Sequence, residues 1–359
     1  KLFARRADAE RFDAEIHADI HRGSYIDPSA GRITLAEWAE TWRHDQLHDE
    51  STASFIERAL RLHIVPVLGH LQLSQIRPSH LRHWIKDRLT TLSAQTVRTL
   101  YGSALRPMLH AAVLERLIAV PPFAGVKLPE TPLSDGFAAR PEQVHALADA
   151  MPERYRAIVY VVAGCGLRAG EAYGLTPCAV DFDSHQLHVR HQLKEVRSCP
   201  RPILDQPKTR TSLRTVELPS VVAEALTWHM EHYPPHAVEI EDRTDPQQPR
   251  TRQVELLFTT SQGAPIRRST WAHVWRPAVA KAGLPEGFGL RDLRHYYATL
   301  LIHSGASVKT VQLAMGHATP TITLNTYVNL WPDSIGTTRT IVDEALGHPV
   351  CTQNVPIAG

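Results

Sequence analysis

The sequence lacks the long apolar runs of membrane proteins and the cysteine spacing of disulfide-rich or zinc-binding domains. Its longest apolar stretch, Ala157–Ala163, is far shorter than the ~18 residues expected of a membrane-spanning helix, so we interpret it as one buried helix. A membrane partner is therefore not expected. No C-x-x-C pair occurs among the cysteines, which are Cys165, Cys178, Cys199 and Cys351. This spacing argues against a disulfide framework or a zinc site and favours a reducing, cytoplasmic location.

The chain also lacks a marked excess of charge of either sign. It has 39 Lys and Arg against 37 Asp and Glu, with a formal net charge of +2. Such a balance neither demands nor excludes a nucleic-acid partner, so local clusters of charge must decide. The first residue is Lys1, and neither an initiator Met nor an apolar signal core stands there. We expect that some upstream sequence is missing.

The length and the apolar pattern predict more than one domain. A chain of 359 residues is too long for one ordinary core. Helical spacing, as at Leu35, Trp38 and Trp42, is followed by a proline-containing segment with little periodicity. The expected divisions are a partial N-terminal arm-type module or joint helix at 1–31, a helical core-binding domain at 33–128, a linker at 129–140, a catalytic domain at 141–332 and a tail at 333–359.

The region after the linker predicts a mixture of helices and strands. Apolar spacing favours helices near 153–165 and 168–175, and alternation favours strands at Gln186–Arg190 and Leu213–Leu218. The polar, proline-containing stretch Tyr233–Arg252 is interpreted as a surface loop. The expected fold is therefore mainly α with a small antiparallel β-sheet, an all-helical domain preceding a mixed α+β domain.

Cationic side chains and one phenol dominate the candidate chemistry of this second region. Two guanidiniums hold a phosphodiester well, because each donates paired hydrogen bonds to its non-bridging oxygens as negative charge grows. Taken singly, each residue also has an ordinary role, as a solvated arginine, a surface lysine, a helix-end histidine or a core tyrosine. The candidates, in chain order, are Arg168, Lys208 in a basic β-hairpin, Arg291, Arg294, His317 and Tyr327.

Tyr327 is the candidate nucleophile. A phenol, whose ordinary pKa is about 10, attacks well only if its proton is removed or nearby cations lower its pKa. On a helix, Arg291, Arg294 and His295 lie within about one turn, so that at least two of them share a face. By contrast, we interpret Glu171, one turn after Arg168, as a buried or paired structural carboxylate.

Taken together and in this order, these segments resemble the catalytic domain of the tyrosine recombinase, or phage integrase, family. The resemblance covers about residues 139–332. The helical region also resembles the core-binding domain of integrases, at Ile64–Gly69 and Leu73–Ile76. The matching catalytic segments are Ala163–Glu171 (AGCGLRAGE), Pro207–Thr209 with Arg214–Pro219 (RTVELP), Leu290–Thr299 (LRDLRHYYAT), and Val311–His317 (VQLAMGH) with Thr321–Tyr327 (TITLNTY).

The resemblance implies a site-specific DNA recombinase that integrates or excises a mobile element. In such an enzyme Arg168 and Arg294 would bind the scissile phosphate, and His317 would hydrogen-bond it. Lys208 would protonate the departing 5′-hydroxyl, and Tyr327 would become linked to the 3′-phosphate, with no metal or other cofactor. The implied partners are double-stranded DNA carrying specific recombination sites, a homotetramer on two such sites, and an accessory directionality factor.

Arg291 departs from the family pattern, which usually has a histidine three residues before the second arginine. A guanidinium accepts no proton at working pH, so a histidine base at that place is in doubt. We expect Arg291 to act electrostatically, as a third cation of the phosphate pocket that lowers the pKa of Tyr327. Two alternatives stay open, namely a non-catalytic DNA-binding protein on the same fold and a type IB topoisomerase-like enzyme that relaxes supercoils.

Overall fold

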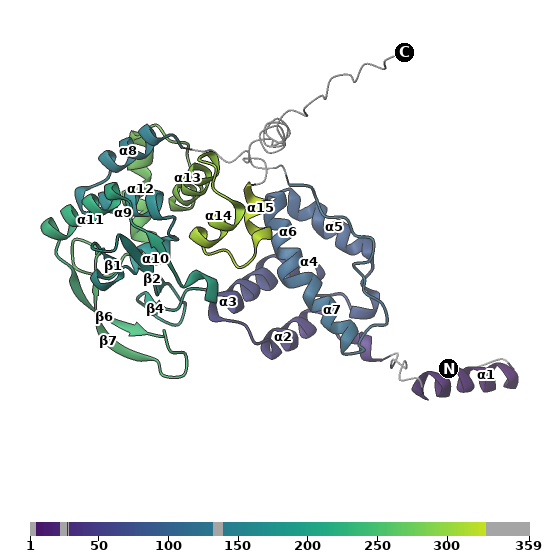
Figure 1. Cartoon of the computed structure of the whole chain (residues 1–359). Coiled ribbons are helices and arrows are strands. Elements are labelled where there is room, and N and C mark those ends of the chain that lie inside the picture. The colour runs from purple at the N-terminus through teal and green to yellow at the C-terminus, as the bar shows by residue number, and fades with distance from the viewer. Residues whose placement is uncertain (1–4, 22–26, 28, 132–138, 328–359) are drawn as a thin grey trace, which may run out of the picture. The chain divides into compact units, whose positions relative to one another are not determined.

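The computed structural model of the chain describes residues 5–21, 27, 29–131 and 139–327. The chain divides into two compact units, residues 1–134 and 135–359 (Figure 1). Each unit contains a hydrophobic core of its own. The predicted tail at 333–359 lies outside the described residues.

The named elements of the first unit's described part are all helical, and one isolated β-bridge joins Thr34 to Gln72. Its helices, including short 3₁₀ and π segments (η), are α1 (Arg6–His21), η1 (Ala30–Arg32), α2 (Leu35–Asp45), α3 (Glu50–Ala59), η2 (Leu60–Ile64), α4 (Val65–Leu68), η3 (Leu73–Gln75), α5 (Pro78–Leu89), α6 (Ala94–Leu100), η4 (Tyr101–Leu105) and α7 (Arg106–Leu114). The all-helical prediction for this region is confirmed.

Helix α2 shows how the sequence specifies these elements. Thr34 caps its N-terminus, because the Thr34 hydroxyl accepts from the Glu37 amide and the Glu37 carboxylate accepts from the Thr34 amide. The residues spaced at three and four, Leu35, Trp38 and Trp42, are all buried. The predicted apolar face is therefore the face that packs into the core.

Two prolines lie inside continuous helical runs of this unit. Pro66 and Pro107 each follow a five-residue π segment, η2 and η4 respectively. Proline has no amide hydrogen for the usual helical bond, and a wider π turn accommodates the lost bond and the bulky ring. Trp84 donates its indole N–H to the His63 carbonyl within η2, at 2.7 Å, and thereby ties α5 to this turn.

The second unit combines helices with two small sheets. Its described elements are α8 (Pro141–Ala150), α9 (Glu153–Cys165), α10 (Ala169–Tyr173), η5 (Pro177–Ala179), β1 (Val180–Asp181), β2 (Gln186–Val189), β3 (Gln192–Lys194), β4 (Ile203–Asp205), η6 (Arg210–Ser212), β5 (Arg214–Glu217), α11 (Ser220–His232), β6 (His236–Asp242), β7 (Arg250–Leu256), α12 (Arg268–Lys281), α13 (Leu290–His303), α14 (Val308–Met315) and α15 (Pro320–Tyr327). The predicted helices at 153–165 and 168–175 and both predicted strands are confirmed.

The sheets differ from the expectation in two respects. One sheet has the order β1-β2-β5 and is antiparallel, but the other has the order β3-β4-β6-β7 and joins β4 to β6 in parallel. Residues 236–242 and 250–256 form a seven-residue antiparallel pair, so the prediction of a surface loop at Tyr233–Arg252 is wrong. Alternate residues Val238, Ile240 and Asp242 are buried, a period-two signal that the polar composition masked.

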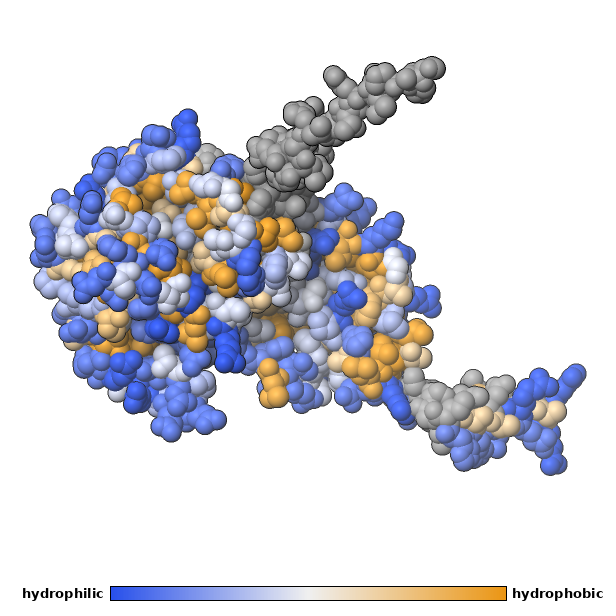
Figure 2. All heavy atoms as spheres, in the orientation of Figure 1, coloured by the Kyte–Doolittle hydropathy of each residue, from blue (hydrophilic) through white to orange (hydrophobic). Residues whose placement is uncertain are grey.

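Helix α9 is the centre of the second core. It packs against α8, α10, α11 and α13, and its residues from Ala157 to Ala163 are almost all buried, which confirms the interpretation of this stretch. A separate small core joins three helices. It includes Tyr297 of α13, Met315 of α14 and Tyr327 at the end of α15. Most of the face in view is hydrophilic, with apolar patches between (Figure 2). This arrangement brings residues far apart in sequence to one place.

Within the described ranges, the helices are too short or too polar to cross a membrane.

Candidate active site

Two glycines end the helices that precede the candidate arginine and the candidate histidine. Gly166 follows α9 with φ 64°, and Gly316 follows α14 with φ 61°, both in the left-handed region. A Cβ on Gly166 would lie 2.3 Å from the Tyr297 ring, and one on Gly316 would lie 3.0 Å from the Thr211 carbonyl. Glycine therefore meets both a conformational and a steric demand at these turns.

Three arginines bind successive carbonyls at the end of α14. Arg214 donates to Ala314, Arg294 to Met315, and Arg168 to Gly316. The last carbonyls of a helix lack partners within it and carry partial negative charge, so they attract cations. These contacts gather the guanidiniums of Arg168, which precedes α10, of Arg214 in β5 and of Arg294 in α13 immediately before His317.

Glu171 lies at the centre of these arginines and is 1% exposed. Its carboxylate binds Arg214 at 2.9 Å and Arg168 at 2.7 Å, and it lies 4.0 Å from Arg294. Burial acts to raise the pKa of Glu171, but the charges and hydrogen bonds of Arg214 and Arg168 more than offset it, so the pKa lies below its ordinary value. The interpretation of Glu171 as a paired structural carboxylate is confirmed.

Arg168 and Arg294 retain donors for a further ligand. Arg168 uses three N–H bonds, to Glu171, Ser212 and Gly316, and Arg294 uses two, to Gly166 and Met315. A guanidinium has five N–H donors. Among the described residues, two donors of Arg168 and three of Arg294 are therefore without an acceptor. Burial, together with the charges of Arg168 and Arg214, lowers the pKa of Arg294 to about 9. The pocket is therefore crowded with positive charge and favours an anion.

His317 lies directly after Gly316, beside the arginines. Its Nδ1 lies 2.9 Å from the Thr323 hydroxyl, a contact with α15. Burial, followed by the charges of Arg294 and Arg168, lowers the pKa of His317 to about 4. The ring is therefore neutral at neutral pH and offers one donor or one acceptor to a ligand.

Tyr327 ends α15 and is 3% exposed. Burial raises its pKa to about 12, although the charges of Arg294 and Arg291 act to lower it. The expectation that cations lower the pKa of Tyr327 below its ordinary value is therefore wrong for this structure, because desolvation outweighs them. Because the charges of Arg294 and Arg291 act on the phenol, Tyr327 lies beside the arginine pocket.

The hydroxyl of Tyr327 is paired with His295 of α13. Its oxygen lies 2.5 Å from His295 Nδ1, and the two rings meet edge to face. On the other side of the same imidazole, Arg291 Nε donates to His295 Nε2 at 3.2 Å. Arg291 is exposed and contacts His295 instead of joining Glu171 and its arginines.

Lys208 makes no described hydrogen bond or ion pair with the other candidates, but the next residue, Thr209, contacts Ser212, which binds Arg168. Lys208 is exposed and follows β4. The prediction of a basic β-hairpin here is wrong, because β4 pairs with β3 and β6, whereas β5 pairs with β2. Lys208 therefore lies on the segment that crosses from one sheet to the other.

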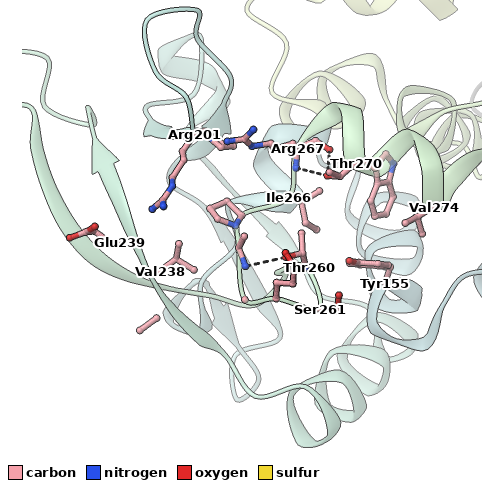
Figure 3. Close-up of a pocket in the computed structure, with 17 residues that line it drawn as sticks. Tyr155, Arg201, Val238, Glu239, Thr260, Ser261, Ile266, Arg267, Thr270 and Val274 are labelled. Atoms are coloured by element: carbon pink, nitrogen blue, oxygen red, sulfur yellow. Dashed lines mark hydrogen bonds between the residues drawn. The ribbon is translucent and has the colours of Figure 1, made fainter.

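A pocket of about 600 Å³ elsewhere in the unit contains none of the candidates (Figure 3). It is lined by the segment Thr260–Arg267, with Tyr155 and Val238 around it. Within it Thr260 accepts from the Ala264 amide, a local turn contact. The lining of the pocket includes Arg201 and Arg267 but none of the arginines that bind Glu171.

The residue patterns of known families match most of the chain. The Phage integrase family matches residues 139–332, more than half of the sequence, and the phage integrase N-terminal SAM-like domain matches residues 34–89. The chain belongs to the phage integrase family. It is a tyrosine recombinase, a site-specific recombinase of DNA.

Relatives of this integrase come from phages and bacteria. An integrase of Mycobacterium phage D29 is 26% identical over 322 residues, covering 88% of this chain and 82% of the relative. A tyrosine recombinase XerC-like protein of Caldanaerobacter subterraneus subsp. tengcongensis is 28% identical over 348 residues, covering 91% and 86%. The likeness therefore extends across both units.

Solved integrases share the fold. The Tn1549 transposon integrase in complex with a circular intermediate DNA has a TM-score of 0.74 at 21% identity, covering 87% of this chain and 99% of that one. A lambda integrase tetramer bound to a Holliday junction has a TM-score of 0.60 at 15% identity, covering 89% and 90%. At these identities the likeness concerns the fold.

Sequence reasoning found most of this integrase's candidate site but not its supports. The structure brings Arg168, Arg294 and His317 together and places Tyr327 beside them. Arg214, which binds Glu171, stands in a segment that resembles the family but has no role predicted from the sequence. His295 is expected only to lie within one helical turn of Arg291 and Arg294, although its spacing of four from Arg291 signals a direct contact on a helix.

Proposed function

We propose that this recombinase cleaves and rejoins duplex DNA through a covalent 3′-phosphotyrosine bond to Tyr327. The observation that carries the proposal is the cluster of Arg168, Arg294 and the neutral His317, with the phenol next to it. Such a cluster suits a phosphodiester, because fixed donors surround the oxygens on which charge develops. The alternative of a non-catalytic DNA-binding protein gains no support from this arrangement.

In the proposed reaction the Tyr327 oxygen attacks phosphorus and the bond to the 5′-oxygen breaks. Arg168 and Arg294 hold the non-bridging oxygens, and His317 donates a hydrogen bond to the same group. Lys208 gives a proton to the departing 5′-oxygen. The phosphotyrosyl bond retains the energy of the broken one, so a new 5′-hydroxyl reverses the step without a nucleotide triphosphate or another cofactor.

The partners in this proposal are duplex DNA carrying specific sites and further copies of the chain. Residues 33–128 act as the core-binding domain and residues 141–332 as the catalytic domain, with 1–31 belonging to a partial arm-type module or a joint helix. The proposal of a homotetramer on two sites is supported by the related lambda integrase tetramer on a Holliday junction. The exchanged DNA belongs to a mobile element, as in the phage and transposon relatives.

Trapping the covalent intermediate tests the nucleophile. The probe is a duplex that the chain itself selects from a random-sequence pool, nicked near the cleavage position so that the short 5′-hydroxyl fragment diffuses away. The parent chain should accumulate a denaturant-stable DNA adduct. Tyr327→Phe should bind the same duplex and form none, because it keeps the ring and loses only the oxygen. An adduct in that variant would refute the assignment.

Two further assays separate the alternatives. A recombinase should exchange partners between two sites, whereas a type IB topoisomerase-like enzyme should relax a supercoiled plasmid without requiring a second site. A DNA-binding protein without activity should do neither. Relaxation in the absence of exchange would overturn the proposal of a recombinase.

A further inference from the structure

His295 lies between the candidate nucleophile and the one candidate arginine that is outside the Glu171 cluster. Its Nδ1 contacts the Tyr327 oxygen at 2.5 Å, and its Nε2 accepts from Arg291 Nε at 3.2 Å. Arg291 and His295 are four residues apart on α13, the spacing at which helical side chains meet. The three groups therefore form a chain of hydrogen bonds that ends at the phenol.

Arg291 determines which nitrogen of His295 is the donor in this series of hydrogen bonds. A guanidinium N–H only donates, so His295 Nε2 must present its lone pair to Arg291. A neutral imidazole carries one N–H, which must then lie on Nδ1. Burial, followed by the charge of Arg291, lowers the pKa of His295 and keeps the ring neutral at neutral pH. In this tautomer Nδ1–H donates to the Tyr327 oxygen and has no lone pair with which to accept its proton.

We propose that His295 is a catalytic residue that donates a hydrogen bond to the Tyr327 oxygen, and that Arg291 is a positioning residue that selects its tautomer. The inference rests on the proposed role of Tyr327 as the nucleophile. It assigns to His295 the stabilisation of the phenolate as it forms, and it excludes His295 as the general base. It also explains how the chain functions with an arginine at position 291.

The protons of the cleavage step balance without a histidine base. The Tyr327 oxygen forms its bond to phosphorus as the bond from phosphorus to the 5′-oxygen breaks. The phenolic proton passes to a non-bridging oxygen of the phosphate, while Lys208 gives one proton to the 5′-oxygen. The proton on the phosphate then passes to Lys208 and restores its charge. The net result is that the phenolic proton of Tyr327 is lost and the 5′-hydroxyl gains one proton.

Several charged or titratable groups face His295. On its own helix these are Arg291, Asp292 and Arg294, and from other elements they are Tyr327 of α15 and His317. Asp292 acts to raise the pKa of His295, but its carboxylate accepts from the Gly289 amide at the start of α13. Burial and the charges of Arg291 and Arg294 together outweigh Asp292, so the pKa of His295 lies below its ordinary value.

Nitrogen NMR tests the tautomer directly in the parent chain. With the histidine rings labelled with ¹⁵N, the resonances of His295 are assigned by their loss in His295→Asn. We expect a protonated Nδ1 and an unprotonated Nε2 at neutral pH, and a partial shift toward the other tautomer in Arg291→Ala. A protonated Nε2 in the parent chain would overturn the inference whatever the activity of any variant.

Cleavage rates test the role. Asparagine places an amide N–H close to the position of His Nδ1, but it cannot act as a base. On the nicked duplex in a single turnover, His295→Ala should be slower by on the order of 10²-fold, as for a lost oxyanion donor, and His295→Asn should recover most of the rate. His303→Asn, an exposed histidine on the same helix, is the matched control. A His295→Asn enzyme as slow as His295→Ala would indicate a base and overturn the inference, as would a parental rate in His295→Ala.

A substrate with sulfur in place of the bridging 5′-oxygen distinguishes a residue that protonates the leaving group from a residue that acts on the nucleophile. A thiolate leaves without a proton, so this duplex should rescue Lys208→Ala and leave His295→Ala slow. Rescue of His295→Ala would place His295 at the leaving group and overturn the inference. These outcomes are distinct from a failure of the proposed function, which would appear as a covalent adduct in Tyr327→Phe.

Discussion

The interiors of the two units differ in what they bury. Among the described residues the core of the first unit contains apolar side chains, with Trp84 donating its N–H to a helix carbonyl. The second unit additionally buries Glu171, Arg214 and Arg294. A buried ion pair is weak support for stability, because desolvation offsets the attraction. The difference indicates that the second interior holds charged side chains in fixed positions, whereas the first interior contributes to stability through apolar packing.

The largest effects should come from the arginines that have donors left over. Arg168→Ala and Arg294→Ala should each lower single-turnover cleavage by on the order of 10²-fold or more, as for a preorganised oxyanion donor. Leu105→Ala, in the core of the first unit, should lower stability but leave the rate of the folded protein near that of the parent. An unchanged rate in either arginine variant would remove that residue from the site.

Charge and shape should matter differently in the two cores. Glu171→Gln keeps the shape but leaves Arg214 and Arg294 without a buried counter-charge, and should lower the free energy of unfolding of the second unit by about 3–5 kcal/mol. Leu105→Met, which changes the shape but keeps the apolar volume in the first unit, should cost less than about 1.5 kcal/mol. Denaturant titration of each variant provides the measurement. Equal costs would contradict the contrast between the two interiors.

Acid should weaken the second unit before the first. The pKa of His317 falls to about 4 on folding from an ordinary value of 6.5, so the unfolded chain binds more protons between these values. Its contribution to stability is present above pH 6.5 and is lost as the pH falls toward 4. Burial also lowers the pKa of His191, His229 and His295 in this unit.

In the first unit, burial lowers the pKa of His63. Unfolding followed from pH 7.5 to 4.5 should therefore show a falling midpoint for the second unit, and His317→Gln should flatten that fall. Earlier acid unfolding of the first unit would contradict this expectation.

The smallest expected effect concerns a helix cap of the first unit. Thr34→Ala removes the hydroxyl that accepts from the Glu37 amide and should lower the free energy of unfolding by about 1 kcal/mol. Thr34→Ser keeps the hydroxyl and should retain most of the stability. A cost well above about 2 kcal/mol for Thr34→Ala would mean that the first unit depends on polar contacts more than its apolar core implies.

The sequence by itself determined the elements whose signals are local. The spacing of Leu35, Trp38 and Trp42 is enough to define the buried face of a helix, and the alternation at 186–189 is enough to define a strand. The order of Arg168, Arg294, His317 and Tyr327 likewise indicates a phosphate site, because residue identity alone supplies the cations and the phenol that such a site needs.

Only the tertiary structure decided which of these residues touch. Local periodicity does not determine which strands pair, so the sequence predicts a hairpin at Lys208 although β4 and β5 belong to different sheets. Burial is also a collective property, and it raises the pKa of Tyr327 where the nearby cations alone would lower it. The pairing of His295 with that phenol depends on how α13 meets α15, because a hydrogen bond between distant segments requires the packing that brings its two atoms within reach.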